Sequence, residues 1–308
     1  MRSALGIMYA KVESTYGTDS VPTGAANAIQ AFDVKLDPQH ESLERDDLAV
    51  TKSKLKSLGG KRNYELSFYV ELRGSGAAGT APRGVSDLLK ACDHTETVSA
   101  GVSVTYAPRS GSLQSCTIYL FMDGVRHILT GCVGDMEFSG VAGEVAKLKF
   151  KIKCLYATPT DQALPSSPTY DSTVPVVLKN LTATMDTFAA VIRELMLKQG
   201  NKITDRGDLT ATHGIRGFDV VDRNPEGEIT VEATTLATKN WYTKFEADTV
   251  QVLSVAIGAS AGNICTITAN QCRLKNIPYD ISDGILIHKL PFQMARSTAD
   301  DEYAIVFT

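Results

Sequence analysis

Two glycine-rich stretches match the signatures of enzymes. The first, "GSGAAG", places Gly74, Gly76 and Gly79 in the G-x-G-x-x-G pattern of a dinucleotide-binding turn. Such a turn needs a buried parallel strand before it, a helix directly after it and an acidic residue about 20 positions further on. Here the preceding segment alternates polar and apolar residues, Pro82 delays the helix, and position 99 is serine. We therefore interpret the stretch as a flexible glycine-rich loop.

The second stretch, "GASAG" at 258–262, satisfies the G-x-S-x-G pattern of a hydrolase nucleophile, with Asp283 and His288 following Ser260 in the required order. That nucleophile sits on a turn between a strand and a helix. The segment "NICTITA" that follows is strand-like, so the pattern indicates a hairpin turn. Too little chain remains after Ser260 to complete a hydrolase sheet.

The other chemical signals are weaker still. "SLGGKRN" has Leu55 where a P-loop needs glycine, and Arg62 where it needs Ser or Thr. The adhesion tripeptide Arg206-Gly207-Asp208 is interpreted as a turn. The histidines have no metal-ligand spacing, and neither do the cysteines, which we expect to be free and buried; the histidines stand at 40, 94, 127, 213 and 288, and the cysteines at 92, 116, 132, 154, 265 and 272. We predict a non-enzymatic protein without a cofactor or metal.

Composition indicates a globular protein. Of 308 residues, 43% are apolar and 21% charged, and the net charge is −4. No apolar run is long enough for a membrane span, so no membrane partner is expected. The N-terminal residues lack the features of a signal peptide, which predicts synthesis in the cytoplasm. No cluster of Lys and Arg predicts tight nucleic-acid binding.

The chain is predicted to be mainly β. Short segments rich in β-branched and aromatic residues are separated by turns, and several alternate, as "KLKFKIK" at 147–153 does. We expect one short helix in each half, at 84–92 and 236–245. Residues 186–200 have helical spacing, but they align with the alternating "AFDVKLD" in the first half, so we predict a strand there.

The two halves share landmarks at one offset. Arg45, Asp47 and Leu48 lie 161 residues before Arg206, Asp208 and Leu209, and the pair Arg62-Asn63 lies 161 before Arg223-Asn224. Further on the offset changes, but Cys132 and Cys154 have the same spacing as Cys272 and Met294. Between the halves, 157–173 is rich in Pro and small polar residues. We predict a duplication, with domains at 1–158 and 174–308 joined by a linker at 159–173.

Several motifs resemble one viral family. "AKVESTYGTDSVPTGAANAI" at 10–29, followed by "ERDDL" and "GGKRN", is similar to the start of major tail tube proteins of long non-contractile-tailed bacteriophages. The second half adds Arg223, Pro225 and Gly227 of an R-x-P-x-G turn. The resemblance implies two tandem β-sandwich or barrel domains, each with one short flanking helix, the first also carrying an N-terminal arm.

The resemblance also implies a function. Such proteins stack as rings into a tube that conducts double-stranded DNA, and a duplicated chain is expected to form trimers of pseudo-sixfold symmetry. The implied partners are further copies of the chain, the tape measure protein, and terminator and tip proteins; the implied location is the virion tail, with assembly in the host cytoplasm. A neutral or acidic lumen would let DNA slide without specific binding.

Two long charged loops, at about 37–63 and 198–224, are expected to cross the interface between rings. The candidate interface residues are Arg45, Asp46, Asp47, Arg62, Arg206, Asp208 and Arg223. The alternative is that these side chains only cap their own turns. The alternative function is an adhesion or carbohydrate-binding β-sandwich module, although Trp241 is the only tryptophan and no carboxylate cluster suggests calcium.

Overall fold

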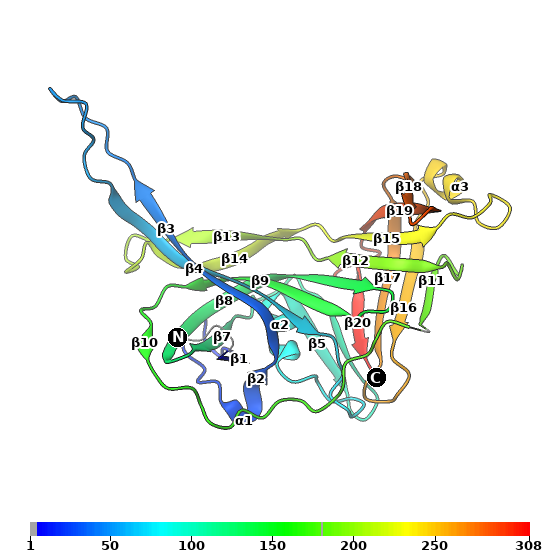
Figure 1. Cartoon of the computed structure of the whole chain (residues 1–308), viewed down its shortest axis with the longest axis horizontal. Helices are drawn as coiled ribbons and strands as arrows, with labels where there is room; N and C mark the ends of the chain where they lie inside the picture. Colours follow the sequence, from blue (N-terminus) through cyan, green and yellow to red (C-terminus); the bar gives the residue numbers. More distant parts are fainter. Residues whose placement is uncertain (1–4, 180) are drawn as a thin grey trace.

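A computed structural model describes residues 5–179 and 181–308 (Figure 1). The elements of the first half are β1 (Gly6–Val12), α1 (Gly24–Asn27), β2 (Ala28–Ile29), β3 (Ala31–Leu43), β4 (Leu58–Glu71), α2 (Val85–Ala91), β5 (His94–Ser99), β6 (Ser103–Pro108), β7 (Cys116–Met122), β8 (Val125–Val141), β9 (Lys147–Leu155) and β10 (Thr160–Asp161). The prediction of a mainly β chain with short helices is confirmed.

The second half is likewise made of short strands and a short helix. Its elements are β11 (Thr182–Met185), β12 (Ile192–Lys198), β13 (Asn201–Gly207), β14 (Ile215–Arg223), β15 (Glu226–Glu232), α3 (Trp241–Glu246), β16 (Gln251–Ile257), β17 (Cys265–Leu274), β18 (Tyr279–Ser282), β19 (Ile285–Met294) and β20 (Ala304–Phe307). None of the helices within the described ranges is both long and apolar enough to span a bilayer.

Alternation of side chains explains the strands. In β9, Leu148, Phe150 and Ile152 are buried, whereas the lysines between them are exposed or half-buried. Successive side chains of a strand point to opposite faces, so this pattern places one face on the core. On the other face Lys149 and Lys151 lie 3.9 and 2.9 Å from Glu137 of β8. Strand β9 therefore packs its apolar side chains on the core and pairs Lys149 and Lys151 with Glu137 on the other face.

The strand predicted in 186–200 is confirmed for β12, where Leu195 and Leu197 are buried. The first-half helix α2 lies within the predicted 84–92, and the four-residue α1 was not expected. The second-half helix begins at Trp241 rather than at 236. Its start is set by Asn240, whose side chain accepts a hydrogen bond from the Thr243 backbone N–H at 3.2 Å.

The prediction of long loops is wrong over about half of 37–63 and over most of 198–224. Strands β3 and β4 form one long hairpin with a loop only at 44–57, and β13 and β14 form another with a turn at 208–214. The outer part of the first hairpin is polar on two faces, and the second hairpin buries only a few residues such as Phe218, so neither shows the regular apolar alternation by which strands are recognised.

Each half builds a set of antiparallel strand pairs. In the first half β4 pairs with β9, β9 with β8, β8 with β7 and β7 with β1. In the second half β15 pairs with β19, β19 with β17, β17 with β16 and β16 with β11. The helix α2 contacts β1, β5 and β8 of the first half.

The two halves are joined by backbone ladders. Strand β12 pairs with β8, with Leu197 opposite Phe138, and β20 pairs with β6, with Ile305 opposite Tyr106. One apolar core, which includes Phe68 and Phe292, extends through both halves. The segment 159–173 contains β10 and runs along the first half, where Arg83 donates to the carbonyl of Thr169 at 3.1 Å. A domain boundary in that segment stays a prediction.

Candidate self-assembly surfaces

The β3–β4 hairpin projects from the body of the molecule (Figure 1). Its loop, residues 44–57, is exposed almost throughout, and Leu48 and Val50 are fully exposed. The flanking Leu43 and Leu58 are about half exposed. Exposed apolar side chains on a projecting loop can be buried against another chain, and such burial is favourable. The hairpin is therefore a candidate contact between copies of the chain.

Three of the predicted interface residues lie in this loop. Arg45, Asp46 and Asp47 are exposed, and Asp46 forms an ion pair with Lys54 at 3.4 Å. Both partners of that pair are more than two-thirds exposed, and such surface pairs contribute little to stability. The charges of the loop are thus available to a partner. Whether they take part in ring stacking stays a prediction.

Arg62 lies at the base of the same hairpin, on β4. Its side chain is exposed, and its backbone N–H donates to the carbonyl of His213 at 3.3 Å. His213 belongs to the turn of the second hairpin, and its ring also packs edge-on against Tyr156, with the centroids 4.9 Å apart. The structure therefore brings the first hairpin against the tip of the second, which the sequence did not indicate.

The second hairpin, β13–β14, does not project but lies along the first half (Figure 1). The Tyr16 hydroxyl accepts from the backbone N–H of Phe218 at 2.7 Å and donates to the carbonyl of Gly131 at 3.1 Å. The ring of Phe218 is fully buried in a small cluster with Val133 and Ile215. An ion pair of 3.0 Å joins Lys153 of β9 to Asp205 of β13. Side-chain and backbone contacts together fix this hairpin on the first-half sheet.

Arg206 and Asp208 lie near the tip of the second hairpin. Arg206 is exposed. The carboxylate of Asp208 accepts from the backbone N–H and the hydroxyl of Thr210, at 2.8 and 2.7 Å, and these hydrogen bonds lower the pKa of Asp208. This is the geometry by which Asp stabilises a turn of its own chain. For Asp208 the turn-capping alternative therefore describes the contacts, and a role between rings stays a prediction.

Arg223 is the member of the predicted set with the densest contacts inside the chain. Its guanidinium forms ion pairs with Asp300 and Glu302, the latter at 3.0 Å, and donates to the carbonyl of Arg109 at 2.7 Å. Only 13% of its side chain is exposed. Although burial acts to lower it, hydrogen bonds to the two carboxylates raise the pKa of Arg223. Its participation in ring stacking stays a prediction.

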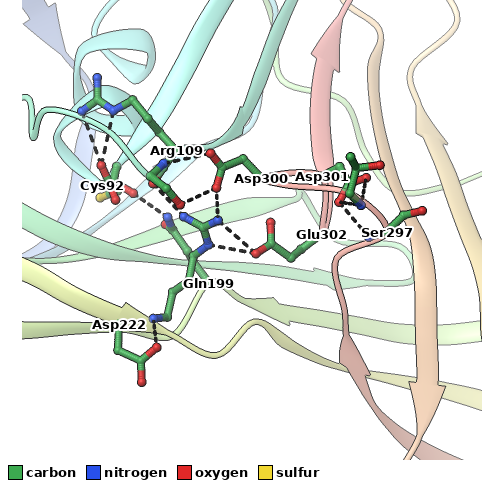
Figure 2. A network of polar contacts seen from close by, with 12 residues as sticks. Cys92, Arg109, Gln199, Asp222, Ser297, Asp300, Asp301 and Glu302 are labelled. Carbon is green, nitrogen blue, oxygen red and sulfur yellow. Dashed lines mark hydrogen bonds and ion pairs between the residues drawn. The ribbon is translucent and has the colours of Figure 1, made fainter.

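The network around Arg223 spans both halves of the chain. Figure 2 shows Arg109 and Cys92 of the first half beside Gln199, Asp300 and Glu302 of the second. The Gln199 side chain donates to the carbonyl of Cys92 at 2.6 Å, and Arg109 pairs with Asp93 at 3.4 Å. Sequence reasoning missed Asp300 and Glu302 as partners of Arg223, because they lie 77 and 79 positions away and no local sequence pattern links them. The network holds the C-terminal segment and β14 against the first half.

A second exposed apolar surface lies on the β18–β19 hairpin. Tyr279 and Ile281 are 57% and 70% exposed, and Ile285 and Leu286 are nearly half exposed. Within the described residues β18 is paired with β19 alone, and β3 with β4 alone, so each has one open edge. This surface was also missed, although the run "YDISDGILI" carries several apolar residues around a turn. Open apolar edges are sites of pairing with another chain.

The last group of sequence candidates comprises the possible metal ligands and the Ser260 pattern. No group of three or more His, Cys, Asp or Glu side chains there is arranged to hold a metal ion. Ser260 lies in the turn between the antiparallel strands β16 and β17, as expected, and His288 is buried against Tyr279. The described cysteines are free and buried, in agreement with the prediction.

Comparison with known families gives one match over nearly the whole length. The model of a family described as phage tail tube protein matches residues 3–294. No curated protein sequence matches the chain.

Proposed function

Because the chain belongs to the phage tail tube protein family, we propose that its copies form rings, that the rings stack into the tail tube, and that double-stranded DNA passes through the lumen. Proteins of this family are structural components of the virion tail. The observation that carries the proposal is the β3–β4 hairpin, which extends beyond the fold with Leu48 and Val50 of its charged loop exposed. Burial of such surface drives association between protein chains.

The chain also carries the kind of surfaces that a ring needs. The open edge of β3 and the open edge of β18 belong to different strands with different side chains. Contacts between two unlike surfaces add copies head to tail, and they form a ring when the rotation between copies closes. A closed ring covers both edges, which would otherwise invite uncontrolled pairing.

We further propose that the chain is a duplicated tube protein whose trimer has pseudo-sixfold symmetry, with domains at 1–158 and 174–308. The strand registers support a duplication. In β3–β4 Leu36 is opposite Leu66, and in β12–β15 Leu197 is opposite Gly227, each 161 positions later. Two copies of one duplicated strand pair would keep the same register in this way.

A shared irregularity gives independent support for the duplication. The β7–β8 pairing shifts register just after the pair Cys116–Cys132, and the β16–β17 pairing shifts just after the pair Gln251–Cys272. In each case the cysteine on the longer strand donates its thiol to the carbonyl three residues earlier. Cys132 donates to Leu129, and Cys272 donates to Ala269. The same bulge thus occurs at the same place in both halves.

The remaining parts of the proposal concern partners and place. Assembly in the host cytoplasm, on a tape measure protein and between tip and terminator proteins, follows from the family. The net charge of −4 suits a lumen that passes DNA without retaining it, because each neutralised phosphate would add to binding.

Negative-stain electron microscopy of the purified chain tests the proposal. We expect rings or tubes with a central hole, which increase with protein concentration. A monodisperse monomer at high concentration, checked by analytical ultracentrifugation, would contradict it and favour an adhesion module instead.

A further inference from the structure

The junction between the halves shows how one repeat unit meets the next. Strand β12 is paired on one side with β15 and on the other with β8 of the first half, where Leu197 is opposite Phe138, Met196 opposite Ser139, and Leu195 opposite Gly140. The first-half counterpart of β12 is β3, at the offset of 161. It has β4 on one side and an open edge on the other.

The second-half counterpart of the end of β8 is β18. Leu66 is opposite Ile152 of β9 and its counterpart Gly227 is opposite Phe292 of β19, so β9 and β19 correspond at an offset of 140, which makes His288 the counterpart of Leu148. Phe138 of β8 is opposite Leu148, and Tyr279 of β18 is opposite His288. Both hairpins then turn at a glycine of positive φ, Gly143 at 85° and Gly284 at 78°. Tyr279, Asp280 and Ile281 therefore stand where Phe138, Ser139 and Gly140 stand in the first half. Within the described residues the end of β8 pairs with β12 on its other side, whereas β18 has no strand on that side.

From this correspondence, and resting on the proposed function, we propose that β18 of one copy pairs antiparallel with β3 of the next copy. The register of β8 against β12 is carried over, with Val34 lying in the β3 bulge between Phe32 and Lys35. It places Tyr279 opposite Leu36, Asp280 opposite Lys35, and Ile281 opposite Val34. The occupant of each open edge is thus a second copy of this chain.

The side chains at these positions are complementary, although the register was set by backbone pairing alone. Asp280 and Lys35 carry opposite charges and are both exposed. Asp280 already pairs with Lys289 on its own hairpin at 2.7 Å, so its carboxylate would lie between two lysines. The exposed Tyr279 and Ile281 would each face an aliphatic residue that is half-buried now. Opposite charges and apolar pairs directly across an antiparallel ladder are stabilising.

A pair of equivalent cavities supports the same docking. In the second half a cavity of 620 Å³ lies beside β12, β11 and β16, and Phe138 and Gly140 of β8 form part of its wall. In the first half the corresponding cavity beside β3, β1 and β7 measures 1020 Å³ and has no such strand along it. It is lined by apolar residues that include Ile7, Phe32 and Leu120. A neighbouring β18 would supply the missing wall.

Cysteine crosslinking tests this register. One chain carries Lys35→Cys, and a second, enlarged by an N-terminal tag, carries Asp280→Cys. The described native cysteines are buried and should not compete. Directly opposed Cβ atoms in a ladder are about 4.5–5.5 Å apart, close to the spacing that a disulfide spans. Under mild oxidation we expect the mixed dimer to form at least tenfold faster than with Glu246→Cys, a control on the exposed face of α3.

A charge exchange provides the second measurement. Lys35→Glu and Asp280→Lys should each lower the assembled fraction several-fold in sedimentation, and the double variant should recover most of it. If the unmodified chain assembles but neither the crosslink nor the recovery is seen, the register is wrong and the proposed function stands. If the unmodified chain stays monomeric at all concentrations, both are overturned.

Discussion

Gly76 donates its backbone N–H to the carbonyl of Gly262 at 2.9 Å. This contact joins the loop after β4 to the turn between β16 and β17, and so brings together the two stretches that match enzyme signatures. A Cβ atom on Gly262 would lie 2.4 Å from the carbonyl carbon of Gly76, and one on Gly74 would lie 2.1 Å from the Gly262 oxygen. Glycine is needed at these places because two backbones approach closely and form a direct hydrogen bond.

Gly262→Ala should destabilise the chain. The backbone at Gly262 has φ of 83°, and the added Cβ would overlap backbone atoms that cannot move independently. The strained conformation and the overlap together should lower the free energy of unfolding by about 2–4 kcal/mol. Urea unfolding followed by the fluorescence of Trp241, which is buried, measures the loss.

The matched control is Gly143→Ala. Gly143 has nearly the same φ, 85°, but open space around its Cβ position. It should lose only about 1 kcal/mol, from the backbone conformation alone. Equal losses for the two variants would show that the close approach of the two loops contributes nothing.

Arg223→Ala should destabilise the folded chain rather than act only on assembly. It leaves Asp300 and the mostly buried Glu302 without their cation, and loss of one partner of a buried pair costs about 3–5 kcal/mol. Because Asp300 is about one-third exposed, we expect about 2–4 kcal/mol. Arg206→Ala, at an exposed position, should change the free energy of unfolding by less than about 0.5 kcal/mol.

A double-mutant cycle separates the contribution of the Arg223–Glu302 ion pair from the other contacts of Arg223. Arg223→Ala combined with Glu302→Gln should lose clearly less stability than the sum of the two single changes. Additive losses would mean that the ion pair does not couple the two segments.

Arg45→Glu together with Arg206→Glu should weaken the stacking of rings without unfolding the chain. Both side chains are exposed, and neither is needed by the fold as described. We expect shorter tubes and a lower yield by electron microscopy, with the thermal midpoint unchanged. Lys179→Glu, an exposed charge reversal outside both hairpins, serves as the control. Unchanged tube length and yield would remove these arginines from the interface.

The buried His94 should make stability depend on pH. Burial lowers the pKa of His94 to about 4, and its ring nitrogens lie 3.0 Å from the Leu89 carbonyl and 2.7 Å from the Tyr303 hydroxyl. The unfolded chain binds a proton below about pH 6.5, whereas the folded chain does not until about pH 4. Stability is therefore lost as pH falls through this window, by up to about 1.4 kcal/mol per pH unit.

The test compares His94→Gln with the unmodified chain. Asp87 acts in the opposite direction in the same window, because burial raises its pKa to about 6. The informative quantity is thus the difference between the two stability curves from pH 6.5 to 4, with His40→Gln, on the exposed part of β3, as the control. We expect a shallower slope for His94→Gln, and parallel curves would exclude His94 as a source of the dependence.

The fold was predictable from sequence where one face of a strand is buried. In β9 the alternation of apolar and polar side chains predicted the strand directly. Strand β12 was predicted from its alignment with the alternating segment of the first half. In both strands one face lies on the core. The exposed parts of β3, β4, β13 and β14 were not recognisable, since both their faces are polar. Their pairing is fixed by the ladder that continues from the core, a non-local cause.

The candidate surfaces were predictable only in part. The repeat drew attention to the two charged segments, but it could not show that each contains a hairpin, nor that one projects and the other folds back onto the first half. That difference depends on contacts such as Tyr16 with Phe218, whose residues are 202 positions apart. In the same way, Arg223 could not be told apart from Arg62 by its neighbours in sequence, because its carboxylate partners come from the C-terminal segment.

The ladders β8–β12 and β6–β20 have a mechanical consequence. To rotate one half against the other, backbone hydrogen bonds in both ladders would have to break together, so each chain should resist bending as a single stiff plate. In a tail made of such plates, curvature would come from small tilts between successive layers, and the bore would keep its diameter while the particle flexes.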